Sequence, residues 1–112
     1  MGNVLHAQEK EWEAIEKSAT PTLVDFWADW CAPCRMLAPV FERLAENYAN
    51  EVNFAKVNVD ELPELASELG IRSIPTLLLI RDGKVLERLV GVRSHQELAD
   101  VLDRHLVAPE KK

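Results

Sequence analysis

The two cysteines of the chain, Cys31 and Cys34, are separated only by Ala32 and Pro33, and the chain has no others. A run rich in β-branched and aromatic residues (22–28) precedes them, and a helical pattern follows. A cysteine at the start of a helix faces unpaired backbone N–H groups and the positive end of the helix dipole. Both favour the thiolate, which is the nucleophile of disulfide chemistry. The spacing therefore predicts a strand, a turn and a helix that carry a redox pair, with the first sulfur open to water.

The composition indicates an ordinary globular protein. The chain has 112 residues, of which 47% are apolar and 29% charged, and its net charge is −6. This length is enough for one domain to bury a core without extra cross-links. We therefore expect a single domain over residues 1–112, with its core at about 4–107 and a short polar C-terminal tail. The absence of a basic stripe argues against nucleic acid as a partner, and the absence of a long apolar run argues against membranes.

The first ten residues do not have the pattern of a secretory signal, because no apolar stretch follows a basic start. We expect the protein to be cytoplasmic. In that reducing compartment a lone pair of cysteines is more often catalytic than structural.

Hydrophobic periodicity predicts elements in the order β-α-β-α-β-α-β-β-α. The expected strands are 4–8, 22–28, 52–59, 76–80 and 84–90, and the expected helices are 9–17, about 33–48, about 63–69 and about 94–106. Asp82-Gly83 is a hairpin signal, and Ser94 with Glu97 is a capping box for the last helix. Helices that alternate with the first strands imply parallel crossovers, and the final hairpin adds an antiparallel edge. The predicted fold class is α/β, with helices on both faces of a mixed sheet.

Two helices are expected to bury one apolar side each. On the first helix and just beyond it the inward residues are Trp12, Ile15 and Ala19. On the helix that follows the cysteines they are Met36, Leu37, Val40, Phe41, Leu44 and Tyr48.

With these elements placed, the chain resembles the thioredoxin family over roughly residues 4–106. The residues that carry the resemblance are Val24–Ala28, Trp30–Cys34, Ala38-Pro39, Lys56, Gly70–Arg72, Ile74–Leu77, Asp82-Gly83 and Gly91. Two positions depart from the usual pattern: Ala32 stands where the family has glycine, and Arg35 stands where lysine is common. The resemblance implies the thioredoxin fold, a central mixed sheet flanked by helices on both faces.

The positions of the two cysteines assign their roles. Cys31 lies nearer the helix tip and is the expected nucleophile, whereas Cys34 lies one turn into the helix and is the expected resolving thiol. A zinc half-site is disfavoured because His6, His95 and His105 do not follow a zinc spacing. A purely structural disulfide is disfavoured because a loop this short constrains the unfolded chain little.

Asp25 is the one charged residue in the apolar run before the cysteines. If both faces of that strand are covered, burial raises the pKa of Asp25 and suits it to take the proton of Cys34. The alternative is an aspartate at the solvated end of the strand. The resemblance assigns Asp25 the same proton-transfer role and Lys56 as its partner. From the residues alone, Lys56 is more simply a surface lysine.

Pro75 directly precedes an apolar strand. Most X–Pro bonds are trans, but the resemblance implies a cis Ile74–Pro75 bond packed beside the cysteines. The backbone of Ile74 would then be available to an extended substrate segment, in a short form of strand addition.

An exposed apolar surface near the cysteines is expected to be the substrate-binding face. Its predicted members are Trp30, Ala32, Pro33, Ile74, Pro75, Val90 and Gly91. Gly91 would let a partner's backbone approach closely, although a glycine here is also consistent with a β-bulge.

Together these features predict a reductase of protein disulfides. The resemblance implies that a separate enzyme, thioredoxin reductase, recharges the cysteines, that no cofactor or metal binds to this chain, and that the clients are disulfide-containing proteins. We expect a monomer. Two alternatives are a disulfide oxidase or isomerase, and a binding module whose thiols are incidental. Strong oxidants of this fold usually place histidine between the cysteines, and Ala32-Pro33 lacks it, so reduction is favoured.

Overall fold

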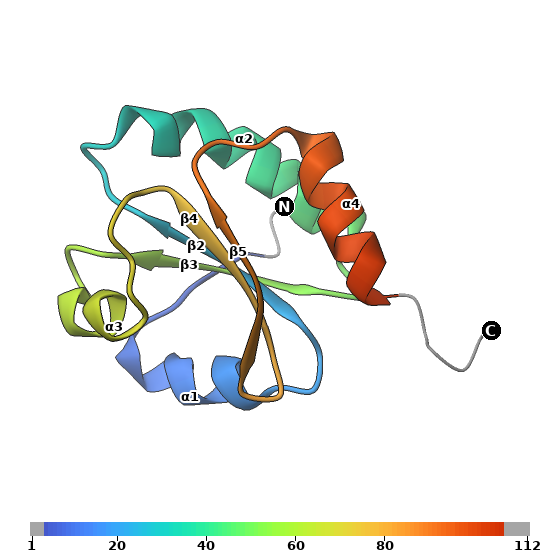
Figure 1. Cartoon of the computed structure of the whole chain (residues 1–112), viewed down its shortest axis with the longest axis horizontal. Helices are drawn as coiled ribbons and strands as arrows, with labels where there is room; N and C mark the ends of the chain where they lie inside the picture. Colours follow the sequence, from blue (N-terminus) through green and yellow to red (C-terminus); the bar gives the residue numbers. More distant parts are fainter. Residues whose placement is uncertain (1–3, 107–112) are drawn as a thin grey trace.

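The computed structural model describes residues 4–106, which form a mixed five-stranded sheet with helices on both faces (Figure 1). The strands are β1 (Val4–His6), β2 (Thr22–Trp27), β3 (Asn53–Asn58), β4 (Thr76–Arg81) and β5 (Lys84–Val90). The helices are α1 (Glu9–Lys17), α2 (Ala32–Asn47), α3 (Pro63–Glu68) and α4 (His95–Leu106). The predicted element order and the α/β class are confirmed.

The sheet order is β1-β3-β2-β4-β5. β1 and β2 both pair with β3 in parallel, β4 is antiparallel to β2, and β5 is antiparallel to β4. The sequence predicted antiparallel pairing only in the final hairpin, between β4 and β5. The antiparallel pairing of β4 with β2 was not predicted. The reason is length: six helical residues rise about 9 Å, too little to carry the chain back along a strand of about 20 Å. The chain therefore enters β4 from the sheet end at which β3 finishes.

Each face of the sheet has its own core. On one face, Leu23 and Phe54 pack with Phe41 of α2 and Leu102 of α4. On the other face, Phe26 packs with Trp12 of α1, whose ring meets it edge-on at 6.2 Å between centroids. Figure 1 shows α2 and α4 on one side of the sheet and α1 and α3 on the other. The central strand β2 is therefore covered on both faces, as its apolar sequence predicted.

Two residues expected in the core are exposed. Met36 is 66% exposed, because the buried side of α2 is formed by Leu37, Phe41 and Leu44 and Met36 lies off that line. Ala19 is also exposed, because α1 ends at Lys17 and the turn that follows no longer keeps the helical period. The other predicted inward residues of these helices, including Val40 and Tyr48, are buried or packed against the core.

The predicted local signals form as expected. Asp82 and Gly83 both have positive φ, 53° and 75°, which is the backbone of a tight hairpin turn between β4 and β5. At α4 the Glu97 N–H donates to Ser94 Oγ at 3.1 Å, and the Ser94 N–H donates to Glu97 Oε1 at 2.9 Å. No helix in residues 4–106 is both long enough and apolar enough to cross a membrane.

Candidate active site

The cysteine motif lies at the turn from β2 into α2. Cys31 is the N-cap of α2, and its Sγ accepts a hydrogen bond from the Cys34 N–H at 3.2 Å. Pro33 occupies the first turn, where its missing N–H costs no hydrogen bond. Cys31 and Cys34 form a disulfide. The N–H that points at Cys31 Sγ would stabilise a negative charge there in the reduced protein, as predicted from the sequence.

Cys31 is less accessible than predicted. Cys31 is 4% exposed and Cys34 is 2% exposed. Cys31 is therefore the more exposed of the two, as expected, but it is not open to water as the sequence predicted. The two cysteines and Ala28 form a small buried cluster, and Ile74 packs against it. These neighbours come from another part of the chain, which is why the sequence motif alone suggested a freely exposed thiol.

The loop before β4 completes the surroundings of the disulfide. The Ile74–Pro75 peptide bond is cis, as the resemblance implied. The carbonyl oxygen of Ile74 lies 3.7 Å from Cys31 Sγ. Ile74 is partly buried, and its backbone lies beside Cys31, the cysteine with the larger exposed fraction.

Apolar side chains are exposed around this point. Trp30 is 67% exposed, and its Nε1 donates to Asp60 Oδ2 at 2.9 Å, which fixes the orientation of the indole. Val90 is 50% exposed and pairs with Thr76 at the start of β4. The Gly91 N–H donates to Pro75 O at 2.9 Å, so the end of β5 is tied to the cis-proline loop. The residues predicted to bind the substrate thus lie on three separate segments of the chain, two of which the Gly91–Pro75 hydrogen bond joins.

The alternative of a β-bulge at Gly91 is not found. The strand ends at Val90, and the irregularity in the hairpin lies between Leu79 and Ile80 instead. Gly91 has φ 95°, a backbone conformation that side-chain-bearing residues rarely adopt. The glycine therefore serves the turn after β5 and not a bulge.

Asp25 is fully buried within β2, which excludes the solvated-end alternative. It lies on the face of the sheet that α2 covers, since Leu23, two residues earlier on the strand, packs against α2. Neither carboxylate oxygen has a hydrogen-bond partner among the described residues. Burial raises the pKa of Asp25 from 3.8 to about 6, against the opposing attraction of Lys56.

Lys56 is not the surface lysine that its sequence context suggested. Its side chain is 11% exposed, and Nζ lies 4.0 Å from Asp25 Oδ2. The same ammonium lies 4.7 Å from the centre of the Trp27 ring, within range of a cation–π contact. Residues 25 and 56 are directly opposite one another in the β2–β3 pairing. The pairing of two strands therefore brings together what the sequence keeps far apart.

A groove of about 340 Å³ lies beside the disulfide, between Trp30 and Ile74. Its remaining lining residues are Val59, Ile71, Arg72 and Ser73. Sequence reasoning missed Val59 and Asp60 as neighbours of the site. Neither carries a motif, and only the fold brings the loop after β3 next to Trp30.

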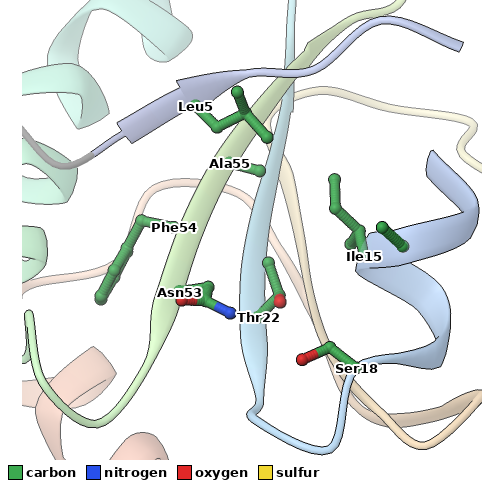
Figure 2. A pocket seen from close by; sticks show the side chains of 8 residues that line it. Leu5, Ile15, Ser18, Thr22, Asn53, Phe54 and Ala55 are labelled. Carbon is green, nitrogen blue, oxygen red and sulfur yellow. The ribbon is translucent and has the colours of Figure 1, made fainter. Parts of the chain in front are cut away.

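A second cavity, of about 380 Å³, lies apart from the cysteines, between α1 and the sheet (Figure 2). None of the predicted site residues lines it. In residues 4–106, no three side chains of the metal-binding types (His, Cys, Asp, Glu) come together as a metal site requires.

Comparison with known proteins matches this geometry. The family model described as Thioredoxin matches residues 3–104. The chain belongs to the thioredoxin family. It is 49% identical to thioredoxin 1 of Synechococcus elongatus over 94 residues, which are 84% of this chain and 88% of that one. It is 43% identical to the chloroplastic M-type thioredoxin of Zea mays over 104 residues, 92% of this chain and 62% of the maize protein. The crystal structure of Malassezia sympodialis thioredoxin superposes with a TM-score of 0.84 at 30% identity, covering 93% of this chain and 90% of the other.

These findings establish the chemistry of the site. The chain is a thiol–disulfide oxidoreductase that reduces protein disulfides, and Cys31–Cys34 is its redox-active disulfide. Members of the family work with thioredoxin reductase and with disulfide substrates.

Proposed function

We propose that Cys31 is the attacking thiol, Cys34 the resolving thiol and Asp25 the base, in a single domain that acts as a cytoplasmic monomer. The observation that carries this proposal is the position of Cys31 Sγ, which accepts the Cys34 N–H at the N-terminus of α2 and lies 3.7 Å from the Ile74 carbonyl. Electrons would come from thioredoxin reductase, and no cofactor would be bound to this chain.

In the first step, the Cys31 thiolate attacks one sulfur of a client disulfide. A bond forms between Cys31 and that sulfur, and the other client sulfur leaves as a thiolate. The N–H of Cys34 and the positive end of the α2 dipole stabilise the Cys31 thiolate before the attack. The product is a mixed disulfide between Cys31 and the client.

In the second step, Cys34 attacks Cys31, because it is the nearest thiol and is held one turn into the same helix. The Cys31–Cys34 bond forms as the bond to the client breaks, and the second client sulfur leaves as a thiolate that solvent protonates. The attack requires an ionised Cys34. Asp25 takes that proton, for which an ionised carboxylate with a raised pKa of about 6 is well matched near neutral pH.

The client would be held as an extended segment along Ile74 and Pro75. The partly exposed backbone of this loop offers hydrogen bonds, and the groove beside Trp30 offers apolar contact. Gly91, tied to Pro75, carries no side chain that would block the segment. Lys56 would act by lowering the pKa of Asp25 and would not contact the client.

Turnover of insulin disulfides with dithiothreitol as electron source tests these roles. Wild-type protein should be active and Cys31→Ser inactive, since serine provides no attacking thiolate. Cys34→Ser should accumulate mixed disulfides with clients on a non-reducing gel, because the first step proceeds and the second does not. If Cys31→Ser trapped clients and Cys34→Ser did not, the two roles would be reversed. Equal rates in wild type and Cys31→Ser would leave only a binding module.

The proposed location and partner need their own tests. The relatives include bacterial thioredoxins and a plant protein named as chloroplastic, so fractionation of the source cells decides the compartment. Reduction of the purified protein by NADPH and thioredoxin reductase, followed through NADPH absorbance, tests the electron donor. No NADPH oxidation would remove this reductase from the proposal.

A further inference from the structure

Three titratable residues lie in one line across the sheet. His6 of β1 is directly opposite Lys56 of β3, and Lys56 is directly opposite Asp25 of β2. Residues opposite one another in neighbouring strands point to the same face of the sheet. Successive side chains of a strand point to opposite faces, and Figure 2 shows this for Phe54 and Ala55, the two residues of β3 that precede Lys56. The row of His6, Lys56 and Asp25 therefore lies on the face that α2 covers.

Exposure falls steadily along this row. His6 is exposed at the edge strand, the Lys56 side chain is 11% exposed, and Asp25 is fully buried. Within residues 4–106, the one charged group in contact with Asp25 is the Lys56 ammonium, at 4.0 Å. A proton that Asp25 takes from Cys34 must leave again before the next cycle. Because the carboxylate oxygens have neither surface nor a hydrogen-bond partner in the described residues, this proton needs a route.

A polar cavity of about 250 Å³ adjoins the outer half of the row. Its lining includes His6, Trp27, Asp29, Lys56, Asn58 and Glu61. The volume holds several water molecules, each of which takes up about 30 Å³ in the liquid, and the lining offers them hydrogen-bond partners. His6 and Lys56 both line the cavity, so it connects an exposed imidazole with the ammonium group that contacts Asp25.

We propose that this cavity is the proton outlet of Asp25 and that His6 is the group at its mouth that exchanges protons with solvent. This inference rests on the proposed role of Asp25 as the base for Cys34. After the Cys34 thiol proton has passed to Asp25, water in the cavity carries it past Lys56 to the imidazole of His6. The imidazolium then releases the proton to buffer. Histidine is suited to this task because it gains and loses a proton near neutral pH.

The charges around the cavity favour this direction. The carboxylates of Asp29 and Glu61, which line the cavity with His6, attract a proton away from Asp25 and towards the mouth. His6 acts through Asp25 and does not touch the reacting sulfurs.

The test compares His6→Gln with the matched control His95→Gln. Glutamine keeps a polar side chain at the exposed edge strand but cannot accept and release a proton near neutral pH. His95 of α4 forms a hydrogen bond with Asn47 of α2 and is absent from the cavity lining. The readout is the rate of proton exchange at the Asp25 carboxyl in the reduced protein, measured by NMR with carboxyl-labelled aspartate near pH 6, in weak buffer.

We expect His6→Gln to slow this exchange by roughly tenfold, which is less than the loss from removing a base that touches the reacting atoms. Added imidazole should restore the rate in His6→Gln, and His95→Gln should exchange as wild type does. Thermal unfolding of each variant identifies any that is not folded, and His6→Asn then provides a second neutral replacement. Wild-type exchange in a folded His6→Gln or His6→Asn overturns the proposal. An Asp25 carboxyl that does not titrate near neutral pH would instead contradict the proposed role of Asp25 itself.

Discussion

The Lys56 ammonium lies 4.0 Å from Asp25 Oδ2, in a part of the sheet where Asp25 has no contact with solvent. Two effects act in opposite directions on the pKa of Asp25 in this pair. Burial raises the pKa of Asp25, and the positive charge of Lys56 lowers it, with burial the larger of the two. The carboxyl is left with a pKa of about 6, so that small changes in this pair alter its charge near neutral pH.

Asp25→Asn should stabilise the protein at neutral pH. The pKa of Asp25 is about 6 in the folded protein and 3.8 ordinarily, so the folded state holds the proton more tightly than the unfolded state. The cost of ionising Asp25 is absent below about pH 4, grows as the pH rises, and is complete above about 6. At that point it amounts to roughly 3 kcal/mol, an upper value if the fold relaxes around the charge. Urea unfolding at acidic and at neutral pH measures it. A stability gain that is the same at both pH values would contradict this account.

The same substitution should slow the resolving step. In the wild type the rate of this step should rise with pH through about 6, as Asp25 becomes ionised and can accept the Cys34 proton. In Asp25→Asn we expect a loss of roughly a hundredfold near neutral pH, since water or buffer replaces the base only poorly. Rapid-mixing measurements of client release from the mixed disulfide across the pH range provide the test. An unchanged pH profile would remove Asp25 from the mechanism.

Lys56→Met should raise the pKa of Asp25 further. The substitution removes the one attraction that lowers this pKa and keeps the buried side chain at a similar length. NMR titration of the Asp25 carboxyl measures the change directly. The resolving step should then need a higher pH than in wild type, and Lys56→Arg, which keeps the charge, is the control. A pKa that stays near 6 in Lys56→Met would show that the ammonium has no effect on Asp25.

Asp60→Ala should weaken client binding with little effect on folding. Asp60 accepts the Trp30 Nε1–H at 2.9 Å, and both residues are exposed, so we expect a stability change within about 0.5 kcal/mol. Without this bond the indole loses its fixed orientation beside the groove. KM for a protein disulfide should rise, whereas the rate with a small disulfide should not change. Glu13→Ala, which removes an exposed acid on α1, controls for net charge.

Local features of this fold could be predicted because they depend on interactions between residues that are close together in the chain. The Asp82-Gly83 turn, the Ser94–Glu97 capping box and the start of α2 at the cysteines each depend on a few consecutive residues. The antiparallel direction of β4 could not be predicted in this way, because β4 pairs with β2, from which two helices and β3 separate it in the chain.

The sequence by itself determined the redox pair, its place at a helix N-terminus and the order of the elements. Only the tertiary structure decided that Ile74 closes over Cys31, 43 positions away in the chain, and that Lys56 meets Asp25 across two strands. The physical reason is that exposure, charge pairing and the pKa of a buried acid depend on atoms that the fold brings near. A residue's neighbours along the chain do not specify these atoms, whereas strand pairing and helix packing do.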